Sequence, residues 1–404
     1  MRLYKNLNQV ITMKSAHEKD GRNLKAEDLS IIKNASVVFD HEKILWVGGD
    51  EFLPEEYQEL EGISLEGHIL LPEIVDAHTH LVFGGDRSQE YMMRLSGATY
   101  EEIAAMGGGI VSTMKATNAL SRTELLKLAQ DRIKTLKSYG VGTIEIKSGY
   151  GLNFEKEYEI ALIINDLKKI FQPDVQILHT FMAAHAIPKD FETSYEYMKE
   201  VVLPLLDKLH TEGLVDAVDI FHEVNYFNRE DVVSLFERAH RLGIPVKMHA
   251  DELNDNSGAE LGIDFQALSC DHLLKISDSG IEKLAKSNTV ANLLPGTAFF
   301  LGKPQSPARK LLDKGVKVAI SSDYNPGSCH FDNVIQIALM SAPTLKMNFA
   351  ELWCAITLNA SHALGLKEQG AIIAGLKPRF SIFNVQNLET MTYHWGKNFS
   401  VRRN

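Results

Sequence analysis

The chain has few cysteines for its length, and the three it has are scattered. Cys270, Cys329 and Cys354 occur among 404 residues, an odd number that is too sparse for a disulfide framework. We therefore expect reduced thiols, as in a cytosolic protein. Cys270 lies close to His272 in the sequence, and Cys329 lies close to Asp323. Roles as metal ligands or nucleophiles therefore stay open for both, although a buried free cysteine is commonly just a small apolar residue.

Long apolar runs and an excess of basic residues are also lacking. No segment approaches the ~20 apolar residues needed to span a bilayer, and Met1 to Ala16 lacks the uninterrupted apolar stretch of a signal peptide. The formal net charge is -11, whereas a nucleic-acid or membrane-surface partner would favour a basic patch. We therefore predict a cytoplasmic protein with no nucleic-acid or membrane partner. The sequence leaves the oligomeric state open, and a homodimer remains an alternative to a monomer.

From residue 67 onward, short apolar runs alternate with amphipathic helices. One predicted helix runs from Glu230 to Leu242 with a single apolar face, and another begins with the capping-box pattern of Ser121 and Glu124 and ends at Gly140. Eight such alternating units with nearly continuous apolar strands predict an α/β fold, a parallel (β/α)₈ barrel rather than an open sheet. The apolar runs are residues 69–75, 141–146, 175–181, 215–221, 244–248, 267–270, 289–294 and 316–320.

The two ends of the chain have a different pattern from the barrel. Residues 1–66 contain short strands and turns without βαβ units, and residues 370–385 return to strand-like sequence at 371–373 and 380–383. We expect both ends to form one small β-sandwich domain, residues 1–66 plus 367–404. The catalytic barrel would then comprise residues 67–366.

Three imidazoles and one carboxylate fall at the C-terminal tips of predicted strands, where the catalytic groups of such a barrel gather. His78 and His80 are two residues apart at a strand end, so both rings project from one face and can reach the same cation. His249 and Asp323 each end a later apolar run. Because this donor set suits Zn²⁺ or a similar first-row divalent ion, the sequence predicts a metal site.

A hydrolytic metal site also needs a group that moves a proton from water and an acid for the leaving nitrogen. His272, which closes the sixth predicted strand, and Glu252, which follows His249 closely, can meet these needs. Each has a structural alternative. His272 could hydrogen-bond a neighbouring loop, and Glu252 could face solvent on the following helix.

Arg87 lies within loop reach of the predicted metal site. Its guanidinium could bind a substrate carboxylate through two hydrogen bonds, with Tyr150 and His185 completing the pocket. The alternative is a solvent-facing Arg87 that pairs with Asp86 or Glu90.

Seven segments of the predicted barrel share a pattern with one known family. They are residues 76–87 (DAHTHLVFGGDR), 107–110 (GGGI), 145–151 (EIKSGYG), 184–186 (AHA), 249–252 (HADE), 271–273 (DHL) and 323–327 (DYNPG). Together they resemble the amidohydrolase superfamily and, within it, the imidazolonepropionase family of histidine degradation. The His-x-His motif marks only the superfamily, whereas the segments around Arg87, Tyr150 and Asn325 narrow the resemblance to the family.

The resemblance implies an enzyme with a bound metal ion. It implies a hydrolase of a cyclic amide C–N bond, which converts the small molecule 4-imidazolone-5-propanoate to N-formimidoyl-L-glutamate. The cofactor would be one ion, Zn²⁺ or iron (2+ or 3+). Superfamily members with two metals use a lysine carbamate from strand four, and here that strand ends in Phe221, His222 and Glu223 without a lysine.

The same resemblance gives each candidate residue a role. The metal ligands would be His78, His80, His249 and Asp323. The catalytic residues would be Glu252, His272 and Asp323. The substrate contacts would be Arg87, Tyr150, His185, Glu252, Asn325, Gly327 and Ser328.

Two other functions remain as alternatives. The chain could be a related cyclic amidohydrolase or a purine-type deaminase of the same superfamily, but a deaminase substrate has no propionate and needs no cluster of Arg87, Tyr150 and His185. It could also be a non-catalytic scaffold, because a fold does not imply a function. Such scaffolds typically lose metal ligands, and this chain has all four.

Overall fold

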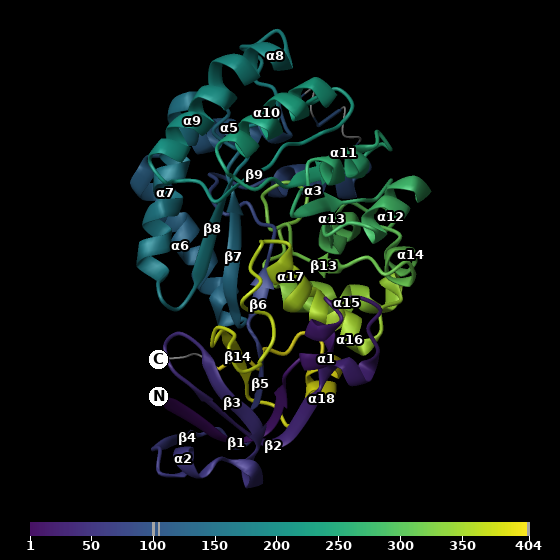
Figure 1. Cartoon of the computed structure of the whole chain (residues 1–404). Coiled ribbons are helices and arrows are strands. Elements are labelled where there is room, and N and C mark those ends of the chain that lie inside the picture. Colours follow the sequence, from purple (N-terminus) through teal and green to yellow (C-terminus); the bar gives the residue numbers. More distant parts are fainter. Residues whose placement is uncertain (99–101, 104–105, 402–404) are drawn as a thin grey trace.

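The computed structural model describes residues 1–98, 102–103 and 106–401, which form a barrel and a smaller sheet (Figure 1). Among these residues, eight parallel strands lie in two four-stranded sheets, ordered β6-β7-β8-β9 and β10-β11-β12-β13. Isolated parallel bridges join the two sheets at both edges, so the ring closes and the predicted barrel is confirmed. Its strands are β6 (Ile74–Asp76), β7 (Val141–Lys147), β8 (Gln176–Phe181), β9 (Ala217–Val218), β10 (Met248–Ala250), β11 (Ser269–His272), β12 (Val290–Leu293) and β13 (Val318–Ile320).

Helices cover the outside of the barrel (Figure 1). Helix α6 (Arg122–Ser138) begins as predicted because the side chains of Ser121 and Glu124 each accept a hydrogen bond from the other's backbone N–H. Helix α10 (Arg229–Arg241) buries the apolar face that its sequence pattern predicts. Every helix of the described residues is too short or too polar to cross a membrane. The others are α1 (Lys14–Glu18), α2 (Glu55–Gln58), α3 (Ser88–Leu95), α5 (Ile110–Ala119), α7 (Phe154–Phe171), α8 (Ser194–Tyr197), α9 (Leu203–Thr211), α11 (Gly258–Asp264), α12 (Asp278–Ala285), α13 (Pro295–Phe300), α14 (Ala308–Asp313), α15 (Val334–Leu345), α16 (Phe349–Ala355), α17 (Leu358–His362) and α18 (Leu388–Tyr393).

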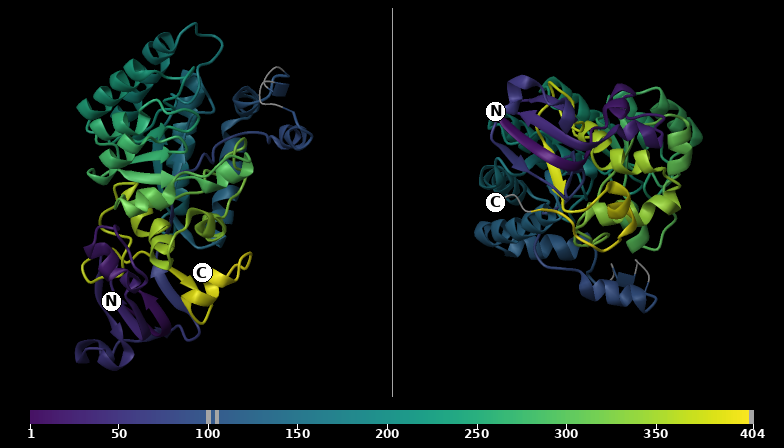
Figure 2. Two further views of the ribbon diagram at one scale, coloured as in Figure 1. Left: turned by 90° about the vertical axis from the view of Figure 1, so that its right-hand side faces the viewer. Right: turned by 90° about the horizontal axis from the view of Figure 1, so that it is seen from below.

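Both ends of the chain contribute to one sheet at the lower end of the molecule (Figures 1 and 2). Its order is β14-β5-β1-β2-β3, with β4 also paired to β1. The sheet has an apolar core of its own, in which the rings of Tyr4, Phe39 and Phe380 pack edge to face. This arrangement is consistent with the predicted β-sandwich domain, although residues 402–404 of that prediction lie outside the described residues. The strands are β1 (Arg2–Ile11), β2 (Ile31–Phe39), β3 (Ile44–Gly49), β4 (Gly62–Ser64), β5 (Ile69–Pro72) and β14 (Phe380–Phe383).

The single strand predicted over residues 69–75 is wrong, because this segment forms two strands in different sheets. Strand β5 pairs with β1 and β14 in the small sheet, and β6 pairs with β7 in the barrel. Both strands are fully buried, so the apolar pattern continues across the change of sheet and cannot reveal it. Residues 371–373 are not a strand either. The domain limits after residues 66 and 366 stay predictions.

The direct passage from β5 into β6 orients the barrel relative to the small sheet. Because β5 lies in the small sheet, the N-terminal ends of the barrel strands face that sheet and their C-terminal ends point away from it (Figure 1). The candidate site residues therefore gather at the end of the barrel that the small sheet leaves uncovered.

Arg379 joins the two parts of the molecule. Its guanidinium donates to a carboxylate oxygen of Glu73 and to the carbonyl of Gly142, both at 2.8 Å, and the Glu73 side chain is only 6% exposed. Removing one partner of a buried ion pair costs about 3 to 5 kcal/mol. We expect Arg379→Met to lower the free energy of unfolding by about 3 kcal/mol in urea denaturation.

Lys377 offers a matched control for this variant. It pairs with Glu368 at 2.9 Å, but both side chains are exposed, and such surface pairs contribute about 0 to 1 kcal/mol. Lys377→Met should therefore change stability little. Equal losses in the two variants would contradict the role given to Arg379.

Candidate functional site

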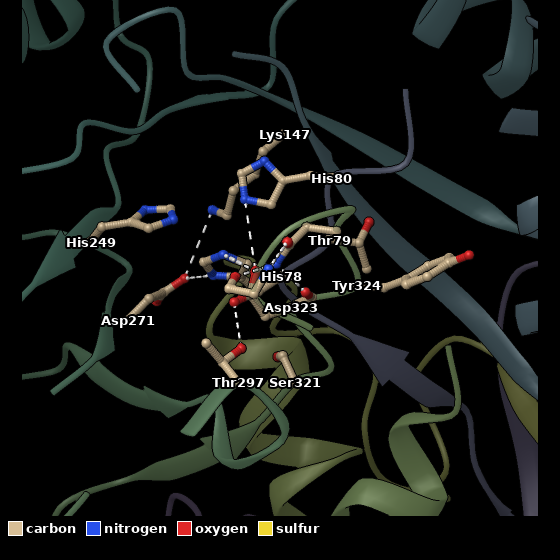
Figure 3. Close-up of polar contacts among 12 residues, drawn as sticks. His78, Thr79, His80, Lys147, His249, Asp271, Thr297, Ser321, Asp323 and Tyr324 are labelled. Carbon is tan, nitrogen blue, oxygen red and sulfur yellow. Dashed lines mark hydrogen bonds and ion pairs between the residues drawn. The ribbon is translucent and has the colours of Figure 1, made fainter. Parts of the chain in front are cut away.

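The four predicted metal ligands meet at the C-terminal end of the barrel strands (Figure 3). His78 and His80 follow β6, His249 lies in β10, and Asp323 follows β13. One nitrogen from each histidine lies within 4.8 Å of the others. Asp323 Oδ1 lies 3.5 Å from His78 Nε2 and 3.9 Å from His80 Nε2. All four side chains are buried, so the fold brings together a donor set that fits one divalent cation.

Hydrogen bonds on the far side of two imidazole rings orient their other nitrogens. His78 Nδ1 lies 2.5 Å from Asp271 Oδ2, and His249 Nδ1 lies 3.0 Å from Asp219 Oδ2. Each Nδ1–H therefore donates to a carboxylate, which leaves Nε2 with a free lone pair. His78 Nε2, which faces Asp323, is buried without a hydrogen-bond partner among the described residues. Because such an atom is costly to bury unpaired, it fits a site that holds a metal.

Burial sets the protonation of these rings. It lowers the pKa of His78 and of His80 well below the ordinary value, with nearby positive groups adding to the effect. These two histidines are therefore neutral near pH 7, which is the form that binds a metal. Burial also acts to lower the pKa of His249, but the Asp219 carboxylate outweighs it and raises that pKa.

Glu252 and His272 face one another beside the ligands. His272 Nε2 lies 3.6 Å from Glu252 Oε2, and the two side chains are only 5% and 12% exposed. The alternative of a solvent-facing Glu252 is therefore wrong. Burial raises the pKa of Glu252 and lowers that of His272 to about 4. Burial therefore favours the neutral form of both groups.

Tyr150 and His185 pack against the ring of His80. The rings of His80 and His185 stack with 5.1 Å between centroids, and Tyr150 lies 5.3 Å from His185. The carbonyl of Gly149 contacts His185 Nδ1 at 3.1 Å. Burial raises the pKa of the Tyr150 phenol, which therefore stays protonated and can donate a hydrogen bond. The three rings pack against one another beside the other three predicted metal ligands.

Arg87 lies in the loop after β6, close enough to Tyr150 for its charge to act on the phenol. Its Nε donates to Glu90 at 2.8 Å, so the predicted alternative of a pair with Glu90 is present, yet the Arg87 side chain is only 16% exposed rather than solvent-facing. A Cβ atom on Gly327 would lie 2.0 Å from Arg87 Nη1. Glycine is therefore required at residue 327 for the guanidinium to reach this place.

The Asn325 side chain makes its hydrogen bonds within its own loop. Its Nδ2 donates to Asp323 Oδ1 at 3.0 Å and to Ser328 Oγ at 2.8 Å, and its Oδ1 accepts from the backbone N–H groups of Gly327 and Ser328. Thr297 Oγ1 donates to the other Asp323 oxygen at 2.5 Å. This loop therefore holds the Asp323 carboxylate and shapes the surface on which Arg87 lies.

Comparisons with known proteins agree with this geometry. The amidohydrolase family model matches residues 69–403. The chain belongs to the amidohydrolase family. It is 41% identical over 374 residues to an imidazolonepropionase of Rhizobium meliloti, covering 92% of this chain and 90% of that protein. It is 39% identical over 373 residues to the imidazolonepropionase of Paracoccus denitrificans, covering 91% and 92%. These relatives confirm the predicted family within the amidohydrolases.

Solved amidohydrolase structures share the fold at low sequence identity. An atrazine chlorohydrolase from Arthrobacter aurescens, solved with zinc, superimposes with a TM-score of 0.70 at 15% identity, covering 96% of this chain and 88% of that one. A guanine deaminase from C. acetobutylicum gives 0.68 at 19% identity, covering 97% and 93%. At this identity the likeness extends to the fold alone.

The sequence-based predictions omitted the charged residues behind the histidine ligands. Three of these charged residues lie inside the apolar runs of predicted strands, namely Glu145, Asp219 and Lys247. A charged residue within an apolar strand is the sequence feature that indicates them. A metal-ligand role for Cys270 or Cys329 gains no support, because the candidate metal groups of the described residues contain no cysteine. Cys270 Sγ instead lies 3.8 Å from the carbonyl of Ala259. The roles of the site residues stay predictions.

His249 provides a direct test of the ligand assignment. We expect His249→Ala to fold but to bind far less metal and to turn over little substrate, because the substitution removes one of the proposed metal donors. Metal content after dialysis and activity would both be measured. His240→Ala, on the exposed surface of α10, is the control. Full metal occupancy with normal turnover in His249→Ala would refute the assignment.

Proposed function

We propose that this chain hydrolyses 4-imidazolone-5-propanoate to N-formimidoyl-L-glutamate, with one Zn²⁺ or iron ion. The observation that carries this proposal is the position of Arg87, which lies against Gly327 of the loop that holds Asp323 and acts on the Tyr150 phenol through its charge. Tyr150 in turn packs against His185. A cyclic amide with a propionate tail needs both a cationic contact and a metal site. The cytoplasmic location and the homodimer stay predictions.

The described ligands fit a single ion. His78, His80 and His249 would supply three nitrogens and Asp323 one oxygen. When bound, the ion would polarise the amide carbonyl and lower the pKa of a water molecule. Imidazole and carboxylate ligands suit both zinc and iron.

The substrate would lie between Arg87 and the proton-moving pair. The Arg87 guanidinium would bind the propionate carboxylate in a charge-assisted contact, while its Nε keeps the hydrogen bond to Glu90. Tyr150 would donate to a polar atom of the ring, and His185 would stack on it. Asn325 would act indirectly by holding Asp323 and Ser328, and Gly327 would leave room for Arg87.

The protons would pass through Glu252 and His272. Water adds to the ring carbonyl carbon, and the bond from that carbon to the ring nitrogen breaks. The reaction therefore moves one proton from water to the departing nitrogen. Glu252 would accept the proton and deliver it, with His272 beside it at 3.6 Å stabilising the developing charge.

The most direct test offers freshly made 4-imidazolone-5-propanoate to the purified protein and follows loss of the ring by absorbance. Guanine and a hydantoin serve as controls for a deaminase and for another cyclic amidohydrolase. We expect turnover of the imidazolone alone. Turnover of guanine alone would identify a deaminase, and turnover of none of the three would favour a scaffold.

Glu252→Gln tests the proton-transfer role. The substitution keeps the size of the side chain but removes its capacity to accept a proton. A proton-transfer group contributes ~10²- to 10⁴-fold in rate, so kcat should fall on that scale with metal content unchanged. Loss of metal would make Glu252 a ligand, and unchanged turnover would remove it from the catalytic residues.

Arg87→Met tests the substrate class. A charge-assisted hydrogen bond is worth about 1.5 to 3 kcal/mol, and the tail keeps its charge during ring opening, so the loss should appear mainly in KM. The variant should bind the propionate substrate roughly 10- to 150-fold more weakly. An analogue without the carboxylate should lose little. Equal losses for both would assign Arg87 a structural role instead.

A further inference from the structure

Five charged side chains lie fully buried inside the barrel, directly behind the histidine ligands. They are Glu145 and Lys147 of β7, Asp219 after β9, Lys247 before β10 and Asp271 of β11. Taking charges out of water is expensive unless they are paired. Apolar residues fill most of the neighbouring strand positions, so these charges need a reason other than packing.

Lys147 contacts both carboxylates that orient histidine ligands. Its Nζ lies 2.6 Å from Asp219 Oδ2 and 3.8 Å from Asp271 Oδ2 (Figure 3 shows the Asp271 contact). Among the described side chains it is the one cation with ion pairs to both. Burial opposes its charge, but the surrounding carboxylates outweigh burial and hold the pKa of Lys147 above its usual range. Lys147 is therefore charged in the folded protein.

Lys247 supplies a second positive charge to the same cluster. Its Nζ lies 2.8 Å from Glu145 Oε1 and donates to the carbonyl of Ala77, next to His78, at 2.8 Å. His78, Glu145 and Asp271 have the spacing of a further cation site, but the ammonium groups of both lysines already lie against Glu145. The lysines therefore occupy the place that a second cation would need.

We propose that Lys147 is a positioning residue of the metal site, which acts by holding Asp219 and Asp271 against His249 and His78. The two rings come from different strands, and each is oriented by one carboxylate. One ammonium group between those carboxylates sets both orientations together.

Lys147→Met tests this proposal by metal affinity, without substrate. Residues that orient a metal's ligands typically contribute 10- to 100-fold in affinity. The dissociation constants of Zn²⁺ and Co²⁺, measured by competition with a chelator, should rise on that scale. The visible absorption bands of the Co²⁺ form should shift, because they report the geometry of the ligands rather than stability.

Lys317 provides a matched control. It is a buried lysine paired with Asp20 at 3.1 Å, and it directly precedes β13, at the end of the barrel away from the site. Lys317→Met should lower thermal stability yet leave the metal dissociation constant and the Co²⁺ spectrum unchanged. A similar loss of affinity in both variants would overturn the proposal.

A double-mutant cycle tests whether Lys147 acts through its contact with Asp219 or only through its charge. If Lys147 acts through Asp219, combining Lys147→Met with Asp219→Asn should weaken metal binding by clearly less than the product of the two single effects. Simple multiplication of the two effects would contradict the route. Should Lys147→Met fail to fold, Lys147→Gln keeps a hydrogen-bond donor without the charge and is subject to the same test.

The proposal rests on the metal ligands of the proposed function, and the two can fail separately. Normal metal binding in His249→Ala would overturn the ligand set. Weak binding in His249→Ala together with wild-type affinity and spectrum in a folded Lys147→Met would leave the ligand set intact and refute the role of Lys147.

Discussion

Asp271 and Asp219 each accept a hydrogen bond from the Nδ1 of a histidine, and the arrangement of the whole site depends on these two contacts. An imidazole ring can present either of its nitrogens to a metal ion, and a ring that is free to rotate would hold neither nitrogen in the position for binding. A carboxylate on one side decides which nitrogen carries the proton and which way the other one points. The same two contacts bring negative charge to the back of the site, so the ligands are both oriented and electrostatically suited to a cation.

The barrel makes such contacts available because its strands are parallel and closed into a ring. Residues that end one strand lie beside residues that end the next, and the bridge between Thr79 and Tyr324 closes the ring next to His80 and Asp323. The small sheet occupies the opposite end of the barrel, where β5 runs into β6 (Figure 1). Packing between the two parts therefore stabilises the molecule without occupying the end that carries the chemistry.

The interior of the barrel combines apolar packing with a few buried charges. Glu145 and Lys147 lie in β7, a strand buried along its whole length. Replacing a buried ion pair with apolar residues of similar volume is often neutral or stabilising, so such a cluster is poorly explained by stability alone. Its position behind His78 and His249 gives the functional explanation. At the other end of the barrel, the ion pair of Arg379 and Glu73 has a structural role, because it joins the two parts of the molecule.

The sequence by itself determined the barrel, the position of three histidines and one aspartate at strand ends, and the family, because each depends on a local pattern: alternating strands and helices, two histidines two residues apart, and short motifs. It could not determine where β5 ends and β6 begins, since both strands are apolar while they belong to different sheets. Nor could it pair Asp219 with His249 or Lys147 with Asp271, because these residues are far apart along the chain and lie on different strands. Only the closure of the ring places β9 beside β10 and directs side chains of β7 and β11 toward one another across the barrel interior. The burial that follows turns isolated charges into a network that orients the histidines.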